Sequence, residues 1–324
     1  QEEILFLGPD EGTADFMWWA ADYARRRNYK YWKAFTTGKP PSLGGIPHDL
    51  FGMTTQSVHT YVLGCLKKLN LPENSVTKLQ TGGPDGDLGS NEILISKDKT
   101  IAVIDGAGVL YDPAGIDRSE LTRLAKVRSM VKGFDKSKLG PGGFLVLTSD
   151  RDVTLPTGEL VENGLTFRNE FHLHPLSSAQ LFVPCGGRPG AINGSNVHRL
   201  FDAKGQPRFQ VIVEGANLFL TQDARMVLEK AGVVLYKDAS ANKGGVTSSS
   251  LEVLAALTLN DAEFQKNMMV TSETYPDFYK EYVEEVQKKI CGNAALEFEC
   301  IWKEHEKTGK PRHLLTDEVS EKIN

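Results

Sequence analysis

The chain has 324 residues, and 37 Lys and Arg against 42 Asp and Glu give it a formal net charge of −5. Hydrophobic residues make up 40% and charged residues 24%, which is ordinary for a globular protein and excludes a disordered, collagen-like or disulfide-scaffold chain. A pI of about 5.9 gives no electrostatic reason to expect binding to nucleic acid or to an anionic membrane.

Cysteine usage and hydropathy predict an intracellular, soluble protein of the cytoplasm or the mitochondrion. The four cysteines form no Cys-x-x-Cys pair and no Cys/His cluster with zinc spacing, so we expect free thiols and no metal. No apolar run approaches the ~18 residues that a transmembrane helix needs. The sequence begins at Gln1 rather than at Met, and no charged and then apolar leader follows. We therefore expect the sequence to be cut from a longer polypeptide.

Strands and helices are predicted to alternate along most of the chain. Strands are expected at residues 4–7, 76–80, 101–104, 144–147, 181–183, 211–213 and 233–236. Helices are expected at 13–27, 54–69, 120–131, 223–231 and 251–257, and the first carries an apolar stripe of Phe16, Trp19, Ala20, Tyr23 and Ala24. This order predicts an α/β fold with a doubly wound, Rossmann-like, mostly parallel sheet. From residue 262 onward the spacing predicts a helical C-terminal segment.

A glycine-rich loop follows the strand expected at 76–80. Its glycines, Gly83, Gly86 and Gly89, are spaced for tight turning and for close approach to a pyrophosphate at a helix N-terminus. The strict pattern has glycine where this chain has Pro84, and the carboxylates of Asp85 and Asp87 repel phosphate unless they point away. The loop alone fits a plain turn equally well.

Asp105 strengthens the nucleotide interpretation. It ends the next strand, 16 residues after Gly89, near the ~20 expected of the acid that binds a ribose 2′-hydroxyl. A carboxylate there repels a 2′-phosphate and so favours NAD over NADP. The alternatives are a turn aspartate before Gly106 or the ribose site of a methyltransferase.

Three further loops follow predicted strands, at the edge where an α/β sheet binds ligands. Cys185 and Gly186 lie in the first of these loops, Asn217 in the second and Asn242 in the third. We expect these four residues to line a cofactor site, with ordinary turns and helix caps as the alternative.

Together these segments resemble the glutamate/leucine/phenylalanine/valine dehydrogenase family, and more closely the C-terminal catalytic part of its large-subunit NAD-specific glutamate dehydrogenases. The stretches that carry the resemblance are residues 7–13, 81–92, 183–193, 213–220 and 237–252. The resemblance implies that L-glutamate is oxidatively deaminated to 2-oxoglutarate and ammonia with NAD, in a homo-oligomer. It also implies a cleft wall and hinge at 1–56, a dinucleotide-binding domain at 57–257 and a helical segment at 258–324.

The resemblance assigns roles to matching positions. Asp10 matches the family's proton carrier, although without the resemblance it looks like a helix cap. Thr13 beside it matches a substrate contact, and Ser249 matches the residue that receives the substrate side chain. Thr54 matches a threonine near the nicotinamide carboxamide, and Ser248 and Ser250 are expected to face the sheet or solvent.

Two departures qualify these roles. The family's Gly-Gly-x-Lys-Gly segment, which precedes the Asp10 segment, is absent from this sequence, so we expect these residues alone to be inactive. Pro47, His48 and Asp49 stand where smaller family members carry an arginine. A non-catalytic NAD-sensing module and a dehydrogenase for another amino acid are the alternative functions.

Overall fold

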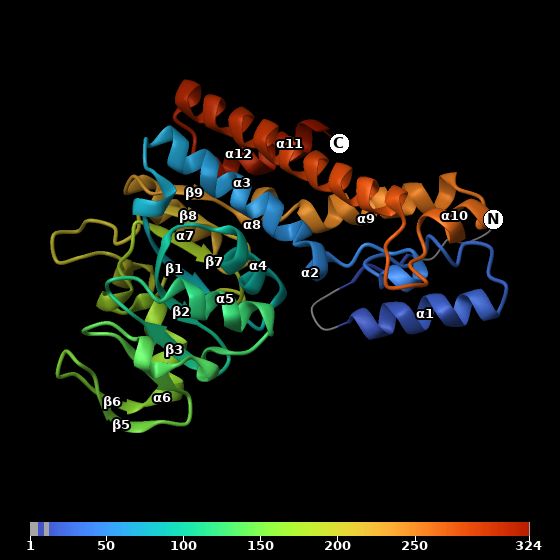
Figure 1. The fold of residues 1–324 in the computed structure, drawn as a ribbon. Helices are drawn as coiled ribbons and strands as arrows, with labels where there is room; N and C mark the ends of the chain where they lie inside the picture. Colours follow the sequence, from blue (N-terminus) through green and yellow to red (C-terminus); the bar gives the residue numbers. More distant parts are fainter. Residues whose placement is uncertain (1–5, 10–12, 324) are drawn as a thin grey trace. The chain divides into compact units, whose positions relative to one another are not determined.

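The alternation of strands and helices builds a large sheet with the strand order β4-β3-β2-β1-β7-β8-β9 (Figure 1). The computed structural model describes residues 6–9 and 13–323. The strands are β1 (Thr77–Thr81), β2 (Lys99–Ile104), β3 (Gly108–Tyr111), β4 (Phe144–Leu147), β7 (Leu181–Pro184), β8 (Val211–Val213) and β9 (Val234–Tyr236). Only β3 runs antiparallel to its neighbours within this sheet. The predicted mostly parallel α/β fold is confirmed.

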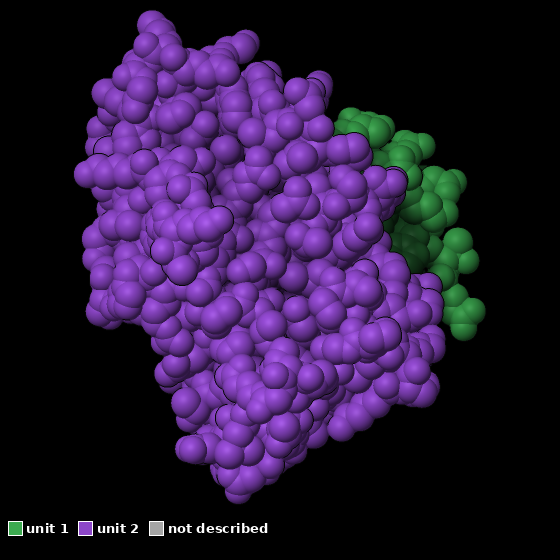
Figure 2. All heavy atoms as spheres, turned by 90° about the vertical axis from the view of Figure 1, so that its left-hand side faces the viewer, with its two compact units in different colours: residues 1–57, 243–293 green, residues 58–242, 294–324 purple. Residues whose placement is uncertain are grey.

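The chain divides into two units, which Figure 2 distinguishes by colour. Unit 1 comprises residues 1–57 and 243–293, and unit 2 comprises residues 58–242 and 294–324. Unit 2 contains the sheet and a separate hairpin of β5 (Arg151–Thr154) and β6 (Leu160–Asn163), which the sequence pattern did not predict. No helix in the described part of the chain is long and apolar enough to cross a membrane.

Helices cover both faces of the sheet in unit 2. The helices are α4 (Asp87–Ile95), α5 (Arg118–Lys126), α6 (Gly164–Glu170), α7 (Gln222–Lys230), α8 (Asp238–Ala241), α12 (Arg312–Ile323) and parts of α3 (Met53–Lys68) and α11 (Asp277–Thr308). Short 3-10 helices of unit 2 span Glu73–Ser75, Val131–Gly133, Lys136–Lys138, Phe171–Leu173, Pro175–Ser177 and Val197–Leu200, and one in unit 1 spans Pro41–Leu43.

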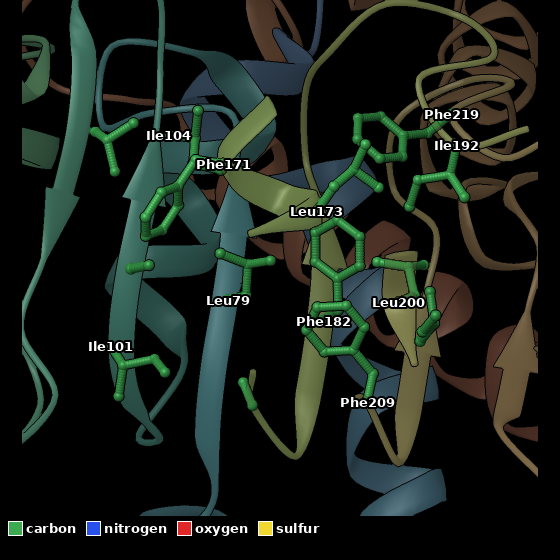
Figure 3. Packing of buried hydrophobic residues seen from close by; sticks show 14 of the residues in the cluster. Leu79, Ile101, Ile104, Phe171, Leu173, Phe182, Ile192, Leu200, Phe209 and Phe219 are labelled. Carbon is green, nitrogen blue, oxygen red and sulfur yellow. The ribbon is translucent and has the colours of Figure 1, made fainter. Parts of the chain in front are cut away.

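Alternating strand residues pack on opposite faces of the sheet, as a pleated strand requires. Leu79, Ile104 and Phe182 point into a core that includes Phe171 and Phe219 (Figure 3). On the other face, Leu181 and Val183 pack with α3, α11 and α12, while Val103 and Leu110 pack with α4 and α5. Burial on both faces explains why these strands appear in the sequence as short continuous apolar runs.

Unit 1 is built from helices around a separate core. They are α1 (Ala14–Arg26), α2 (His48–Phe51), α9 (Gly244–Thr258), α10 (Asp261–Asn267), the first residues of α3 and the first half of α11. Ala255 and Ala256 of α9 share this core with Ala21 and Phe35. Residues 243–257 were expected in the dinucleotide-binding domain, whereas this packing groups them with the N-terminal residues.

The apolar stripe predicted for α1 is wrong in its aromatic members. Phe16, Trp19 and Tyr23 are 65%, 59% and 48% exposed. The buried face carries Met17 and Ala21 instead.

A buried ion pair holds α9 to the loop before α2. Lys39 is fully buried and Glu252 is 1% exposed, and their charged groups are in direct contact. Glu252 Oε2 also accepts hydrogen bonds from the N–H groups of Gly38 (2.9 Å) and Ile46 (2.8 Å), while Lys39 Nζ donates to the carbonyl of Thr36 (2.8 Å). The pair therefore satisfies loop donors and acceptors that burial would otherwise leave unpaired.

We predict that Glu252→Gln lowers the free energy of unfolding by about 3–5 kcal/mol, because it leaves the Lys39 charge buried without its counter-ion. Denaturant unfolding followed by far-UV circular dichroism measures this. Glu281→Gln, at an exposed position of α11, is the matched control and should change stability by less than about 0.5 kcal/mol. Equal stability of the two variants would contradict the account.

Candidate functional site

The strand order changes direction at β1, because β2 lies on one side of β1 and β7 on the other. Two hydrogen bonds join the carboxyl ends of β1 and β7. The Cys185 N–H donates to the carbonyl of Thr81 at 2.7 Å, and Thr81 Oγ1 donates to the carbonyl of Gly186 at 2.6 Å. In open α/β sheets, ligands bind at this kind of topological switch point. The geometry therefore brings the predicted Cys185–Gly186 loop to the edge of the glycine-rich loop.

Glycine is required at several positions around this switch point. Gly82 has a φ of +86°, and a Cβ built there would lie 2.6 Å from the Gly186 nitrogen. A Cβ on Gly83 would lie 2.4 Å from Asp105 Cβ, and one on Gly89 would lie 2.4 Å from the Gly83 carbonyl oxygen. A side chain at any of these positions would collide with its neighbours, so glycine is needed and the backbone of the loop is left uncovered by side chains.

Helix α4 begins immediately behind this loop. Gly86 is its N-cap and has no side chain that could cap the N–H groups of the first turn. Arg128, which sequence analysis did not identify, donates from Nη1 to the Gly86 carbonyl (3.1 Å) and lies 3.3 Å from Asp87 Oδ1. Its guanidinium partly offsets the negative charge of Asp87, which would otherwise repel a phosphate. Arg128 is 41 residues from Asp87 in the sequence, so no local sequence pattern connects the two residues. Arg128 also has a left-handed φ of +51°.

Asp105 ends β2 beside Gly83, and the backbone ties its carboxylate in place. Oδ1 accepts from the N–H groups of Ala107 (2.8 Å) and Gly108 (3.2 Å), and Oδ2 accepts from Val131 (2.6 Å). Burial raises the pKa of the Asp105 carboxyl, while the hydrogen bonds oppose this rise. These three hydrogen bonds use three of the about four acceptor positions of a carboxylate.

The predicted asparagines lie together beyond β8 and β9. The Asn242 side-chain amide donates to the carbonyl of Gly215 and to Asn217 Oδ1 (3.1 Å). Leu218, the next residue, has a left-handed φ of +57°, and its N–H donates to Asp238 Oδ2 at 2.8 Å. The two loops therefore form one hydrogen-bonded edge.

A buried charge network that sequence analysis missed holds this edge. Arg225 Nε and Nη2 contact the two carboxylate oxygens of Glu214 at 2.7 and 2.9 Å, and Nη2 also contacts Asp238 Oδ1 at 3.1 Å. Burial raises the pKa of Glu214, and the Arg225 guanidinium opposes that rise. Two-pronged pairing of this kind fixes direction as well as distance.

In unit 1, the start of α9 lies against the segment that joins α2 to α3. A Cβ on Gly244 would come within 2.1 Å of the Met53 carbonyl oxygen. A Cβ on Gly245 would lie 3.2 Å from both Thr54 Oγ1 and His48 Nδ1. The glycine pair, interpreted from the sequence as a loop, is the first turn of α9, which begins seven residues before the predicted start at Leu251.

Ser249 projects from α9 into a small hydrogen-bonded group in the same unit. Its Oγ accepts a hydrogen bond from Thr37 Oγ1 at 2.9 Å and lies 3.3 Å from His48 Nε2. Ser249 is 9% exposed, Ser248 is fully buried, and the exposed Ser250 donates to the Val246 carbonyl at 3.0 Å. Ser249 and Thr54 thus belong to one small region of unit 1.

The remaining predicted residues are at the N-terminus. Asp10 lies outside the residues that the structure describes. Thr13 is the N-cap of α1, with no side-chain hydrogen bond to the helix, and its carbonyl accepts from the Met17 N–H at 3.1 Å. Within the described part of the chain, no three His, Cys, Asp or Glu side chains are grouped so that they could hold a metal ion.

A glycine-lined switch point before a helix N-terminus, with an acid at the end of the next strand, is the arrangement of a Rossmann-type fold. Residues 44–309 match the family model described as "Glutamate/Leucine/Phenylalanine/Valine dehydrogenase". The chain therefore belongs to that family, as the sequence motifs predicted.

Curated relatives agree with this assignment, and solved structures share the fold. The chain is 62% identical over 322 residues to "Glutamate dehydrogenase 2" of Dictyostelium discoideum and 57% identical over 321 residues to "NAD-specific glutamate dehydrogenase" of Neurospora crassa. The matches cover 99% of this chain but only 31% and 30% of those relatives. A Plasmodium falciparum glutamate dehydrogenase structure has the same fold, with a TM-score of 0.63 and 20% identity over 95% of this chain and 56% of that one.

We predict that Gly83→Ala weakens NADH binding at least tenfold, or about 1.4 kcal/mol, because the new methyl group displaces the loop from Asp105. Fluorescence titration of the natural full-length polypeptide that contains this chain measures the dissociation constant. Gly292→Ala is the control, because a Cβ there meets nothing within 4 Å. Unchanged NADH binding by a folded Gly83→Ala variant would show that the loop is not part of the NADH site.

Proposed function

We propose that the protein containing this chain catalyses the NAD-dependent oxidative deamination of L-glutamate to 2-oxoglutarate and ammonia. The observation that carries this proposal is its high identity to relatives named as NAD-specific glutamate dehydrogenases, over almost all of this chain. Because the chain spans only about three-tenths of the length of those relatives, the activity belongs to the whole polypeptide.

The cofactor proposal is supported by the backbone cradle in unit 2. Gly83, Gly86 and Gly89 would hold the pyrophosphate at the start of α4, where the positive end of the helix favours an anion. Asp105 would accept a ribose hydroxyl. When bound, NAD accepts a hydride from the substrate.

The other predicted cofactor residues would orient the nicotinamide half. Asn217 and Asn242 already share a hydrogen bond, and Arg225 fixes the loop that carries Asn217 through Glu214. Cys185 and Gly186 would shape the crevice wall. Burial raises the pKa of the Cys185 thiol, so this residue would act as a neutral, packed side chain. The family resemblance adds Thr54 as a contact of the carboxamide.

Substrate binding and proton transfer would fall to unit 1 and the N-terminal segment. Ser249 would contact the side-chain carboxylate of glutamate, and Thr13 would contact the substrate near Asp10. Asp10 would take up and return the protons of the amine and carbinolamine steps. A Thermus thermophilus relative of known structure is titled a hetero-hexameric glutamate dehydrogenase. We infer that this protein also works as an oligomer, inside the cell, in the cytoplasm or the mitochondrion.

The proposed activity is tested with the natural full-length polypeptide by following NADH formation with glutamate, leucine, phenylalanine and valine. We expect glutamate to be preferred, because an apolar side chain would leave the buried polar groups of the site without a hydrogen-bonding partner. NADH binding without turnover of any amino acid would instead favour an NAD-sensing module. Preference for leucine would make the protein a dehydrogenase for another amino acid.

For the proton carrier, we predict that Asp10→Asn lowers kcat by about 10²–10⁴ while NADH still binds, because an amide cannot exchange the proton. Steady-state kinetics and NADH titration measure the two effects. If Asp10 only capped a helix, asparagine would replace it without loss of activity, since both residues cap equally well. Near-normal turnover by Asp10→Asn would therefore refute the catalytic role.

For cofactor choice, we predict that the natural protein prefers NAD over NADP and that Asp105→Asn lowers this preference at least about tenfold. The substitution removes the charge that repels a 2′-phosphate, while its side-chain oxygen can keep the bonds to Ala107 and Gly108. The ratio of kcat/KM for the two cofactors measures this. An unchanged ratio in a variant of normal melting temperature would rule out Asp105 as the ribose acid.

A further inference from the structure

His48 occupies the place where smaller family members carry an arginine, and no role was assigned to it from the sequence. In the structure the ring lies within unit 1, and its Nε2 is 3.3 Å from Ser249 Oγ. A Cβ added to Gly245 would lie 3.2 Å from Nδ1, so the ring also packs closely against the first turn of α9.

The hydrogen-bonding capacity of Ser249 limits what this contact can do. A serine hydroxyl has one proton and two lone pairs. Thr37 Oγ1 donates to the Ser249 oxygen at 2.9 Å and so occupies one lone pair. With its proton on Nε2, His48 would donate to the second lone pair and leave the Ser249 proton for a third partner.

The acidic group on the same helix does not take that proton. Glu252 is one turn further along α9, and its carboxylate is already paired with Lys39 and with the N–H groups of Gly38 and Ile46. Burial lowers the pKa of His48, while the charges of Glu252 and Asp49 oppose this fall. The lowered pKa favours the neutral imidazole, which acts through hydrogen-bond direction rather than through charge.

We propose that His48 is a positioning residue that aims the Ser249 hydroxyl at the side-chain carboxylate of a dicarboxylic amino acid. The chain thereby gains selectivity for that substrate over an apolar amino acid of the same length. A hydrogen bond from a hydroxyl to a carboxylate is charge-assisted, whereas an apolar side chain leaves the same hydroxyl without an acceptor. This inference rests on the proposed function and adds to it a determinant of substrate specificity.

The test compares His48→Leu with His48→Gln in the natural full-length polypeptide. The glutamine amide nitrogen can take the place of Nε2 as a donor, whereas leucine fills the volume without donating. For His48→Leu we expect kcat/KM for glutamate to fall about 10–100-fold, mainly through KM. For 2-aminopentanoate, which lacks the side-chain carboxylate, we expect less than about a threefold change, and His48→Gln should recover most of the glutamate activity.

Calorimetric binding of glutarate gives a readout that does not require turnover. Its dissociation constant should rise about tenfold or more in His48→Leu and stay near the natural value in His48→Gln and in the control His198→Leu, which alters an exposed histidine of unit 2. Equal losses for glutamate and 2-aminopentanoate, or no rescue by glutamine, would overturn the role of His48. Absence of glutamate turnover by the natural protein would overturn the proposed function, while glutarate binding would still test His48.

Discussion

The close approach of backbones at the carboxyl ends of β1 and β7 is the constraint on which unit 2 depends. Gly82 lies so near the backbone of Cys185 and Gly186 that a single methyl group would collide with it. Gly89 brings α4 equally close to the loop carbonyls. Because side chains are excluded, the first turn of α4 presents N–H groups, and a pyrophosphate is the kind of ligand that such a surface attracts.

Buried charges hold the polar loops in both units. In unit 2, Arg225 connects Glu214 to Asp238 and so fixes the loop between β8 and α7. In unit 1, Lys39 and Glu252 join the loop before α2 to α9. A buried ion pair adds little net stability compared with apolar packing, but losing one partner is costly. Such pairs make the positions of these loops sensitive to single substitutions.

The sequence predicted those parts of the fold whose signal is local. The strands β4, β7 and β8 were found almost residue by residue, because each is a continuous apolar run buried on both faces. Strand β3 was missed because its first residue is a glycine in a Gly-Ala-Gly turn, and the β5–β6 hairpin was missed because its residues are mostly polar and exposed. The start of α9 was placed too late, because Gly244 and Gly245 weaken a helical pattern that tertiary packing restores.

Site residues divide in the same way. The glycines, Asp105 and the asparagines could be selected because strand ends and motif spacing mark them. Arg128 and His48 could not, because their relevance lies in contacts with residues 41 and 201 positions away. The exposed aromatic face of α1 likewise depends on which neighbours the helix meets, which helical periodicity alone does not specify.

Amide hydrogen exchange of the natural full-length polypeptide, with and without saturating NADH, tests the central claim most directly. If the dinucleotide lies at the switch point of unit 2, peptides covering residues 81–89 and 183–193 should gain protection, whereas the β5–β6 hairpin should not change. Protection confined to other segments, with these two peptides unaffected, would contradict the assignment of the cofactor site.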